Sequence, residues 1–351
     1  GRKLSGVLTI DLEAIAANVR FLQQKVGGSC AVAGVVKADA YGLGMAQIIP
    51  VMEREGCRFF FTATLEEAVA LRKITAQPIA VLSGIAAREA SEFLHYNLIP
   101  VLNTFEDVAH WRGEGRKPAI LHVETGMNRL AMPMSDVQKL IDNPHGLDIQ
   151  MVMSHLACAD EPDHPLNREQ IERFNIIAKN FPKAQKSLAN SSSIFLSPDI
   201  HYDMVRPGMA VYGLNPTPWQ ENPMRPVVKL DVPVVQVKTL KAGESVGYGA
   251  AYRCKGETTV ATVALGYADG FLRSLSNKGT LYFNGKPCPV IGRVSMDLVT
   301  VDVGALPVHV GDKLEVIGDY QSVDDLATAA GTLGYEILTS LGHRYKREYR
   351  G

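Results

Sequence analysis

The segment AVAGVVKADAYGLG, residues 31–44, joins an apolar run to a polar turn. Its first six residues are apolar and include three valines, a composition typical of a fully buried strand. The run stops at Lys37, and a small turn that contains Tyr41, Gly42 and Gly44 follows. The segment therefore predicts a buried strand that ends on an ammonium group, with an aromatic hydroxyl four residues later.

Short apolar runs alternate with helical patterns through the first two thirds of the chain. Residues 12–25 and 45–55 carry apolar side chains at three- and four-residue spacing, which predicts two helices. Thr64-Leu65-Glu66-Glu67 has the pattern of a capping box. Later N-caps are predicted at Thr104, Ser135 and Asn167. The predicted strands lie near residues 31–37, 58–62, 78–83, 97–102, 118–123, 148–155, 186–190 and 202–206.

Eight strands that alternate with helices over about 200 residues favour a (β/α)8 barrel. An open doubly wound sheet is the alternative, but no G-x-G-x-x-G follows the first strand. After residues 213–218 the pattern changes to strands separated by Gly and Pro turns, and helical spacing returns only near 322–341. We therefore predict an α/β protein with a TIM barrel over 9–221 and a mostly β domain over 222–351. The leading strand, residues 6–10, can join either domain, and the β domain can include a strand over residues 1–8.

The overall composition is that of an ordinary globular protein. The 351 residues have a formal net charge of −1, which gives no reason to expect a nucleic acid or an anionic membrane as partner. The five cysteines are widely spaced and form no C-x-x-C, so we predict neither a disulfide framework nor a metal site, and we expect a cytoplasmic location. No apolar run approaches the roughly 20 residues of a membrane span, and the first residues show no signal-peptide pattern.

Polar residues follow several predicted strands, at the rim where barrel enzymes carry their active sites. Five of the eight strands have such residues: Lys37 at the first, Arg129 after the fifth, His155 at the sixth, Asn190 and Ser191 at the seventh, and Arg206 with Gly208 at the eighth. Barrels often bind phosphate with the loops after strands seven and eight, where Ser191 offers a hydroxyl and Gly208 and Met209 offer backbone N–H groups.

A lysine on one side of the rim and a phosphate-binding loop on the other fit pyridoxal 5'-phosphate. A desolvated lysine loses its proton readily and can then attack the aldehyde of the cofactor. Lys37 would hold the cofactor as a Schiff base, and Tyr41 could reach the phosphate. Each residue alone also has a structural interpretation: Lys37 as a surface lysine, His155 as a core histidine, Tyr248 as a packing residue of a sheet.

The joint pattern resembles the alanine racemases, the barrel class of pyridoxal-phosphate enzymes. The resemblance extends along nearly the whole chain. It rests on these motifs: VVKADAYGLG (35–44), ETGMNR (124–129), SH (154–155), ANS (189–191), MVRPG (204–208), GYGAAY (247–252), GYADG (266–270) and GRVSMD (292–297).

The resemblance implies a homodimer that racemises alanine with two bases, Lys37 and the Tyr248 of a second subunit. For the cofactor, the resemblance implies that His155 packs against the pyridine ring, that Arg206 faces the pyridine nitrogen, and that the phosphate is held by Tyr41, Ser191, Gly208 and Met209. For the substrate, it implies that Arg129 faces the carboxylate as well as the phenolic oxygen of the cofactor, and that Met296 binds the same carboxylate. The residues that it implies for the entrance are Tyr267, Arg293, Asp297, Asp160 and Arg273. The product would be D-alanine for peptidoglycan, or the enzyme would serve alanine catabolism.

Two positions depart from the family pattern. Many relatives have a carbamylated lysine seven residues before the arginine of T-G-M-x-R, and this chain has His122 there, so Arg129 must be held by an anion or a direct hydrogen bond. Many relatives also have a phosphate-contacting tyrosine near the C-terminus, where this chain offers His343 and, two residues later, Tyr345.

Three other functions remain as alternatives. A decarboxylase on a similar barrel would present an acidic residue to the ring nitrogen, which Arg206 argues against. A non-catalytic cofactor carrier would lack the second domain. A racemase of broader specificity, with turnover of serine, is compatible with the same residues.

Overall fold

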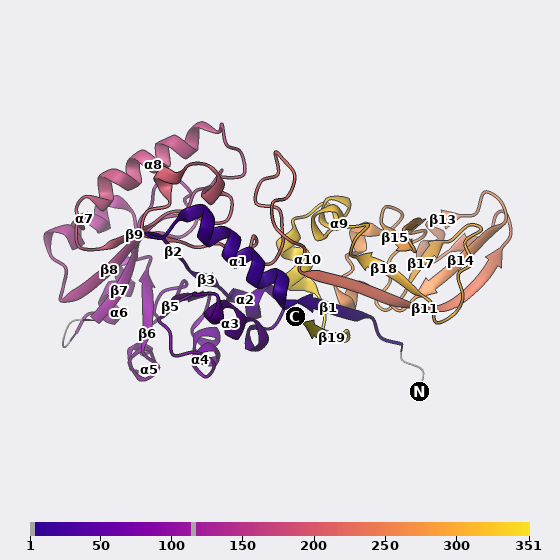
Figure 1. Ribbon diagram of the computed structural model, residues 1–351, viewed down its shortest axis with the longest axis horizontal. Helices are drawn as coiled ribbons and strands as arrows, with labels where there is room; N and C mark the ends of the chain where they lie inside the picture. Colours follow the sequence, from indigo (N-terminus) through magenta and orange to yellow (C-terminus); the bar gives the residue numbers. More distant parts are fainter. Residues whose placement is uncertain (1–3, 114–116) are drawn as a thin grey trace. The chain divides into compact units, whose positions relative to one another are not determined.

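The computed structural model describes residues 4–113 and 117–351 of the chain. These residues form two compact units: Ile15–Arg225, and a second unit made of the first fourteen residues together with Pro226–Gly351 (Figure 1). Residues 1–3 of the strand predicted over residues 1–8 lie outside the described residues. Among the described residues, no helix has the length and apolar character needed to cross a bilayer. All five cysteines are free.

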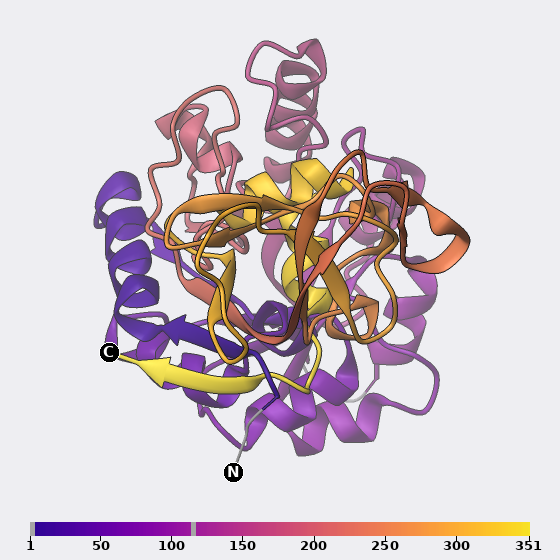
Figure 2. The same cartoon turned by 90° about the vertical axis from the view of Figure 1, so that its right-hand side faces the viewer.

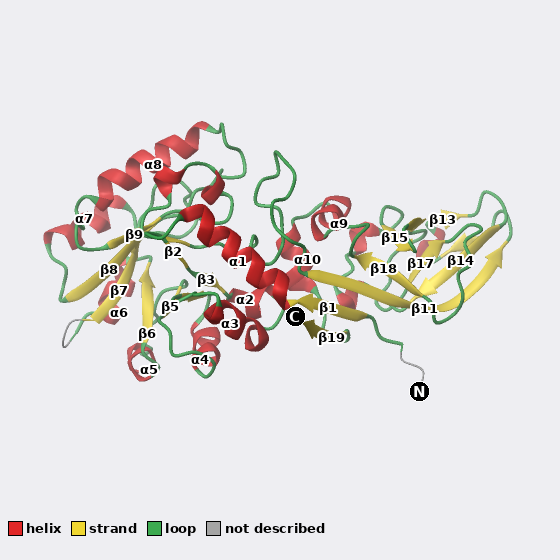
Figure 3. Ribbon diagram, in the orientation of Figure 1, coloured by secondary structure: helices red, strands yellow, loops and turns green. Residues whose placement is uncertain are grey.

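The first unit is built of parallel strands and helices in alternation (Figure 3). Its strands are β2 (Ala31–Val32), β3 (Gly34–Val35), β4 (Phe60–Thr62), β5 (Ile79–Val81), β6 (Leu98–Leu102), β7 (Lys117–His122), β8 (Leu147–Met153), β9 (Gln185–Ser187) and β10 (Met204–Val205). Its helices are α1 (Leu12–Val26), the turn α2 (Lys37–Tyr41), α3 (Met45–Arg54), α4 (Leu65–Arg72), α5 (Ala90–His95), α6 (Phe105–Trp111), α7 (Met134–Asp142) and α8 (Pro165–Ala178), with 3-10 turns at Ser193–Phe195 and Pro198–Ile200.

The strands close into a barrel. Strands β3 to β9 form one parallel sheet in sequence order, and β10 pairs in parallel with β2. The segments β2 and β3 are one interrupted first strand, because only Ala33 separates them. On the other side of β10, the N–H of Arg206 donates to the carbonyl of Ala189 at 2.8 Å. The predicted (β/α)8 barrel is therefore confirmed, and the open sheet is wrong.

Two of the predicted helix N-caps are confirmed. Thr64 and Thr104 each accept the N–H of the residue three positions on, and both helices have a complete capping box. The prediction of Ser135 and Asn167 as N-caps is wrong. Helix α7 begins one residue after Pro133, and α8 begins at Pro165, whose fixed φ suits the first helical position. His164 is the N-cap of α8, and Asn167 lies buried inside that helix.

The second unit is mostly β. Its strands are β1 (Val7–Asp11), β11 (Val228–Leu240), β12 (Ser245–Val246), β13 (Tyr252–Arg253), β14 (Thr258–Val263), β15 (Thr280–Phe283), β16 (Lys286–Pro289), β17 (Val299–Asp302), β18 (Lys313–Ile317) and β19 (Lys346–Arg350). Helices α9 (Val323–Ala330) and α10 (Gly334–Ser340) and the 3-10 turns Tyr248–Ala250, Tyr267–Asp269 and Arg273–Leu275 complete it.

The leading strand belongs to the β unit. Strand β1 lies between β11, to which it is antiparallel, and β19, to which it is parallel, and Figure 2 shows β1 and β19 side by side. Its alternating side chains Leu8 and Ile10 are fully buried, the pattern of a strand with one face on a core. The leading strand therefore pairs with strands of the β unit on both sides.

Candidate active site

Lys37 stands at the start of an unusual backbone segment. The next four residues, Ala38 to Tyr41, all have φ between +53° and +56°. The N–H of Ala40 donates to Val36 O at 3.0 Å and that of Gly42 to Ala38 O at 2.7 Å, so the segment is a left-handed helical turn. This conformation costs about 1–2 kcal/mol for each non-glycine residue. It persists only where the surrounding structure fixes it, and such strain is concentrated at functional sites.

Three side-chain contacts hold this left-handed turn. The Glu67 carboxylate accepts the N–H of Ala38 at 2.7 Å, and Asp39 Oδ1 accepts the N–H of Met45 at 2.9 Å. The ring of Tyr41 packs on that of Tyr212, with centroids 4.7 Å apart. Tyr212 in turn donates its hydroxyl to Val35 O at 2.7 Å, so the end of the strand and the end of the turn are fixed together.

The Lys37 amine lies in a partly buried, positively charged environment. Burial lowers the pKa of Lys37 below its ordinary value, Arg129 and Arg206 lower it further, and the nearby Glu67 carboxylate opposes them. These charges act on the amine only because the barrel brings the ends of its strands together. A lysine with a lowered pKa is more often present as the neutral amine, which is the form that acts as nucleophile or base.

The loop after β10 presents free N–H groups beside Tyr41. Among the residues that the structure describes, neither the N–H of Gly208 nor that of Met209 has a hydrogen-bond partner. The hydroxyl of Tyr41 lies directly against the Cα of Gly208, and Ser191 Oγ accepts the N–H of Ala210 at 3.1 Å. The four residues predicted to bind phosphate therefore come together, and they offer two hydroxyls and two N–H groups to an anion.

The variant Gly208→Ala is expected to disturb this loop. A Cβ at position 208 would overlap the Tyr41 hydroxyl and lie 2.8 Å from Tyr41 Cζ. We expect a loss of about 1–3 kcal/mol in the free energy of unfolding, as in other overpacked sites. Urea unfolding measures it, with Gly256→Ala as control because a Cβ there meets no atom within 4 Å. Equal unfolding midpoints for the two variants would contradict the expectation.

His155 is a neutral imidazole with a defined tautomer. Asn190 Oδ1 accepts both the N–H and the hydroxyl of Ser193, at 3.0 and 2.7 Å. The Asn190 amide nitrogen therefore faces His155 Nε2, at 3.2 Å, and this ring nitrogen acts as the acceptor. Burial, with the charges of Arg206, Arg129 and Lys37 among other contributions, lowers the pKa of His155 to about 3. The ring is thus uncharged at neutral pH and fit to pack flat against an aromatic group.

Arg206 is held inside the barrel wall. Its guanidinium donates to Ser187 Oγ at 2.5 Å and to Ser154 O at 2.6 Å, and the residue is only 6% exposed. Burial lowers the pKa of Arg206 to about 10, so the side chain stays protonated at neutral pH. A guanidinium has donors and no acceptor, so it can donate to a ligand atom but cannot take a proton from it.

His122 lies at the end of β7 and is bonded to Asn103. Asn103 Nδ2 donates to Leu82 O at 2.9 Å, so its Oδ1 faces His122 Nδ1, at 2.8 Å, and accepts from it. Burial, Arg206 and Arg129 lower the pKa of His122 to about 3. His122 is therefore neutral with its proton on Nδ1, and Nε2 keeps a lone pair for a donor.

The two buried histidines make the protein sensitive to acid. Their folded-state pKa values of about 3 lie below the ordinary value of 6.5, so between these pH values the unfolded chain binds more protons. Stability is therefore lost as the pH falls through this range, by about 2 kcal/mol per histidine at pH 5. Urea unfolding at pH 7 and pH 5 measures this. The variant His122→Gln is expected to lose less stability on acidification than the wild type, and an equal loss would contradict it.

Arg129 lies on an exposed loop that returns to the barrel. Glu124 accepts the N–H groups of Gly126, at 2.7 Å, and Asn128, at 3.0 Å, and the N–H of Met132 donates to His122 O at 2.8 Å. The loop is closed at its base, while Arg129 at its tip is exposed. The charge of Arg129 still acts on Lys37, His122 and His155, so the structure brings these predicted residues to one rim.

The predicted residues of the β unit gather on three neighbouring loops. Tyr248 is 73% exposed, and the guanidinium of Arg293 packs over Gly249, where a Cβ would lie 3.1 Å from Nη1. Tyr267 donates its N–H to Ser295 O at 3.0 Å. Met296 is 53% exposed, and its N–H has no partner among the described residues. These loops therefore present a phenol and a free N–H outward from one unit.

Arg344 ties two of these loops together. Its guanidinium donates to both carboxylate oxygens of Asp269, at 2.8 and 3.0 Å, and to Asp297 at 2.8 Å. The buried Tyr345 donates its hydroxyl to Asp269 O at 2.9 Å, while His343 is exposed. Of the other entrance residues, Arg273 is exposed on this unit, and Asp160 is exposed on the barrel unit after β8.

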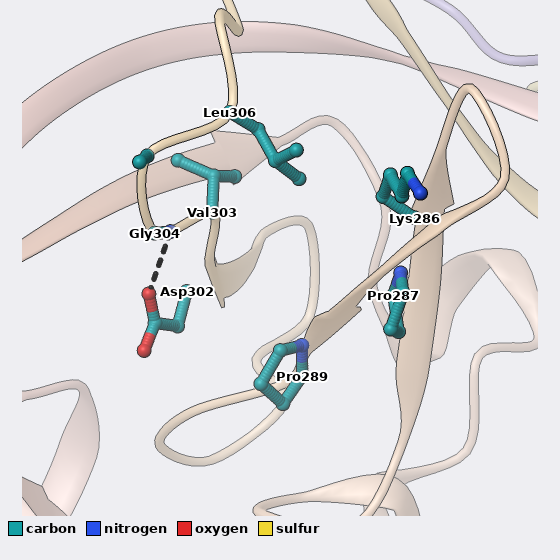
Figure 4. Close-up of a pocket in the computed structure, with 8 residues that line it drawn as sticks. Lys286, Pro287, Pro289, Asp302, Val303, Gly304 and Leu306 are labelled. Carbon is teal, nitrogen blue, oxygen red and sulfur yellow. Dashed lines mark hydrogen bonds between the residues drawn. The ribbon is translucent and has the colours of Figure 1, made fainter.

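Two other surface features lie outside the predicted site. A shallow pocket in the β unit, drawn in Figure 4, is lined by Lys286, Pro287, Pro289, Asp302, Val303, Gly304, Ala305 and Leu306. Its carboxylate is turned to the N–H of Gly304, at 2.9 Å. Cys158, Glu161 and His164 place ligand-type atoms within 4.8 Å of one another in the loop before α8. His164 Nδ1 already accepts the N–H of Leu166 as the helix cap, which leaves Nε2 as its other ring nitrogen.

Comparison with known proteins decides the family. The family model "Alanine racemase, N-terminal domain" matches residues 10–216, and "Alanine racemase, C-terminal domain" matches residues 227–349. The chain belongs to the alanine racemase family. It is 46% identical to "Alanine racemase, catabolic" of Mesorhizobium japonicum, over 98% of this chain and 93% of that protein.

Solved structures of the family have the same fold. A crystal structure of alanine racemase from Bartonella henselae, described as having covalently bound pyridoxal phosphate, is 39% identical, with a TM-score of 0.95 over 99% of this chain and 100% of that one. The biosynthetic alanine racemase from Pseudomonas aeruginosa is 32% identical, with a TM-score of 0.91 over 99% and 100% of the two chains. Relatives of both the catabolic and the biosynthetic kind are therefore similar along the whole chain.

The residues present fit the family's cofactor. A partly buried amine, a neutral imidazole, a protonated arginine and a loop with two free N–H groups converge at one rim. The close approach of Tyr41 to Gly208 leaves no room for a larger residue in that loop. The contacts of Glu67, Asn103 and Tyr212 were not predicted from the sequence. The capping box at Thr64 already marked Glu67 in the sequence, but not its bond to the turn that follows Lys37.

Proposed function

We propose that this chain interconverts L- and D-alanine with pyridoxal 5'-phosphate, as a cytoplasmic homodimer with shared active sites. Family membership over both units supports the reaction, and the cofactor named for the Bartonella henselae structure supports its chemistry. The observation that carries the proposal is Lys37, a partly buried amine with a lowered pKa at the same rim as a free anion-binding loop. Production of D-alanine for peptidoglycan and catabolism of alanine are both consistent with the relatives.

The first unit would bind the cofactor and hold one base. Lys37 anchors the group and takes or returns a proton on one face of the substrate. Tyr41, Ser191, Gly208 and Met209 bind the phosphate, because their hydroxyls and N–H groups meet at one loop. His155 packs against the ring and Arg206 donates to its nitrogen. When bound, the cofactor supplies a sink for the electron pair left by removal of the α-proton.

The protonated state of Arg206 would limit side reactions. A guanidinium only donates hydrogen bonds and keeps its protons, so a ring nitrogen that accepted from Arg206 would keep its lone pair and stay unprotonated. Arg206 would thereby weaken the electron sink that the cofactor supplies, which would favour return of the proton to the α-carbon over transamination or decarboxylation. The three donors of Arg206 that remain free of Ser187 and Ser154 are available for this contact.

The β unit of the partner subunit would complete the site. Tyr248 is exposed in a single chain, and a proton-transfer group in that position needs a further surface to exclude water. We assign Tyr248 as the second base, and Arg129 with the N–H of Met296 as the groups that bind the substrate carboxylate. Tyr267, Arg293, Asp297, Asp160 and Arg273 would form the entrance. A lone pair on His122 Nε2 is available to hold Arg129 by a direct hydrogen bond.

Exchange of the α-proton tests the function. The protein is incubated with L- or D-alanine in deuterated water, and deuterium at Cα and optical rotation are followed together. We expect exchange and loss of rotation from both enantiomers. Bound cofactor with no exchange from either enantiomer would show that alanine is not the substrate, and release of carbon dioxide would indicate a decarboxylase.

A further inference from the structure

We propose that Glu67 is a positioning residue for Lys37, because its carboxylate ties the backbone directly after Lys37 to the N-terminus of helix α4. The significance of Lys37 rests on the proposed function, whereas the contacts of Glu67 do not. Glu67 is the third residue of α4, and its N–H donates to the Thr64 hydroxyl at 3.2 Å. Its own carboxylate then reaches beyond this helix.

One carboxylate serves two barrel loops. Glu67 Oε1 accepts the N–H groups of Ala63 and Thr64, at 2.7 and 3.3 Å, in the loop after β4. Glu67 Oε2 accepts the N–H of Ala38 at 2.7 Å, in the turn after β3. Ala38 is the first residue in the left-handed conformation, so this bond fixes the backbone at the point where it leaves the strand.

The same arrangement recurs in the barrel without a lysine. Asp107, third residue of α6, accepts the N–H groups of Asn103 and Thr104 at 2.8 and 3.0 Å, and that of Ile85 at 3.0 Å in the preceding loop. A carboxylate at this helix position is thus a general way to join adjacent loops. At Glu67 the joined loop carries the Lys37 amine, and the carboxylate charge also opposes the effect of Arg129 and Arg206 on it.

Glu67 acts on Lys37 through its negative charge and through its hydrogen bond to the N–H of Ala38, and three variants separate these two effects. Glu67→Gln removes the charge, and its amide nitrogen would face a backbone N–H on one side. Glu67→Asp keeps the charge but draws the carboxylate back by one methylene, which weakens the bond that the longer side chain makes to the N–H of Ala38 at 2.7 Å. Thr64→Ala removes the hydroxyl that caps α4 and leaves the bond from Ala38 to Glu67 intact, so it serves as the control for damage to the helix end.

The measurement follows the ionisation of the Lys37 amine in the full chain, from which the cofactor has been removed and to which no alanine is added. Acetylation of Lys37 by an amine-acylating reagent is followed by mass spectrometry across pH, with the exposed Lys73 as internal reference, and hydrogen exchange of residues 37–42 is followed alongside. For Glu67→Gln we expect the acetylation midpoint of Lys37 to fall by about 0.5 pH units or more. We also expect exchange at Ala38 to become about 10-fold faster. Glu67→Asp should change the exchange alone, and Thr64→Ala neither.

Either of two results would overturn the proposal. The first is an unchanged midpoint and unchanged exchange in Glu67→Gln, and the second is an equal change in Thr64→Ala. If Glu67→Gln does not fold, Glu67→Asp still decides through exchange at Ala38. No step of this measurement involves racemisation. A protein that fails to exchange the α-proton of alanine would therefore refute the proposed function, while the role of Glu67 would still be decided by acetylation and hydrogen exchange.

Discussion

Replacement of Lys37 by alanine is expected to lower α-proton exchange from both enantiomers of alanine by at least about 10⁴-fold. The variant loses the cofactor anchor and one of the two bases at once. Lys37 directly precedes the left-handed turn, and its amine is the one on which the charges of Arg129 and Arg206 act at the rim.

Exchange in deuterated water measures the loss for each enantiomer separately. Lys73→Ala, which removes an exposed lysine at the end of helix α4 in the same unit, is the control and should keep wild-type exchange. Thermal unfolding of Lys37→Ala establishes that the barrel still forms. A folded Lys37→Ala protein with exchange within tenfold of wild type would refute the assignment of this residue.

The second large effect is expected for Tyr248→Phe. Removal of one hydroxyl should reduce exchange from one enantiomer by about 10²–10⁴-fold, the usual contribution of a proton-transfer group, and leave exchange from the other largely intact. The asymmetry arises because the two bases act on opposite faces of the substrate. Tyr252→Phe, four residues on and packed against a buried cluster of the same unit, is the matched control.

Mixed dimers test whether Tyr248 acts in the partner's site. When Lys37→Ala and Tyr248→Phe proteins are dissociated and reassociated together, half of the dimers contain one chain of each. In these dimers one site carries both changes and the other carries neither, so about a quarter of wild-type racemisation should return. No recovery in demonstrably mixed dimers would place Tyr248 and Lys37 of the same chain in one site, or remove Tyr248 from the reaction.

The architecture could be predicted from local sequence patterns because each strand and helix carries its own periodicity. The eight barrel strands and the β character of the rest are confirmed, and so are the capping box at Thr64 and the N-cap at Thr104. The caps at Ser135 and Asn167 were wrong because a proline near each helix start moved the boundary, which the preference of serine and asparagine for caps does not reveal.

The chemistry of the site was less accessible to sequence analysis, because it depends on contacts between distant segments. The left-handed turn has two alanines and a tyrosine, which give little sign of positive φ, and a single aspartate, which tolerates it. The tautomer of His122 depends on Asn103, nineteen residues earlier, and that of His155 on Asn190, thirty-five residues later. The lowered pKa of Lys37 likewise arises from burial first, and then from Arg129 and Arg206, which the fold brings to the same rim.

The pairing of β1 has a consequence for the synthesis of the protein. Val7 pairs with Asp231 and with Lys346, so this strand leaves the ribosome long before either neighbour exists. At usual translation rates the nascent β1 waits about 10–40 s for β11, and longer for β19. During that interval its apolar Leu8 and Ile10 have no partner within their own sheet. The barrel, whose strands β3 to β9 pair with neighbours in sequence, can form meanwhile as an insertion between the two parts of the β unit.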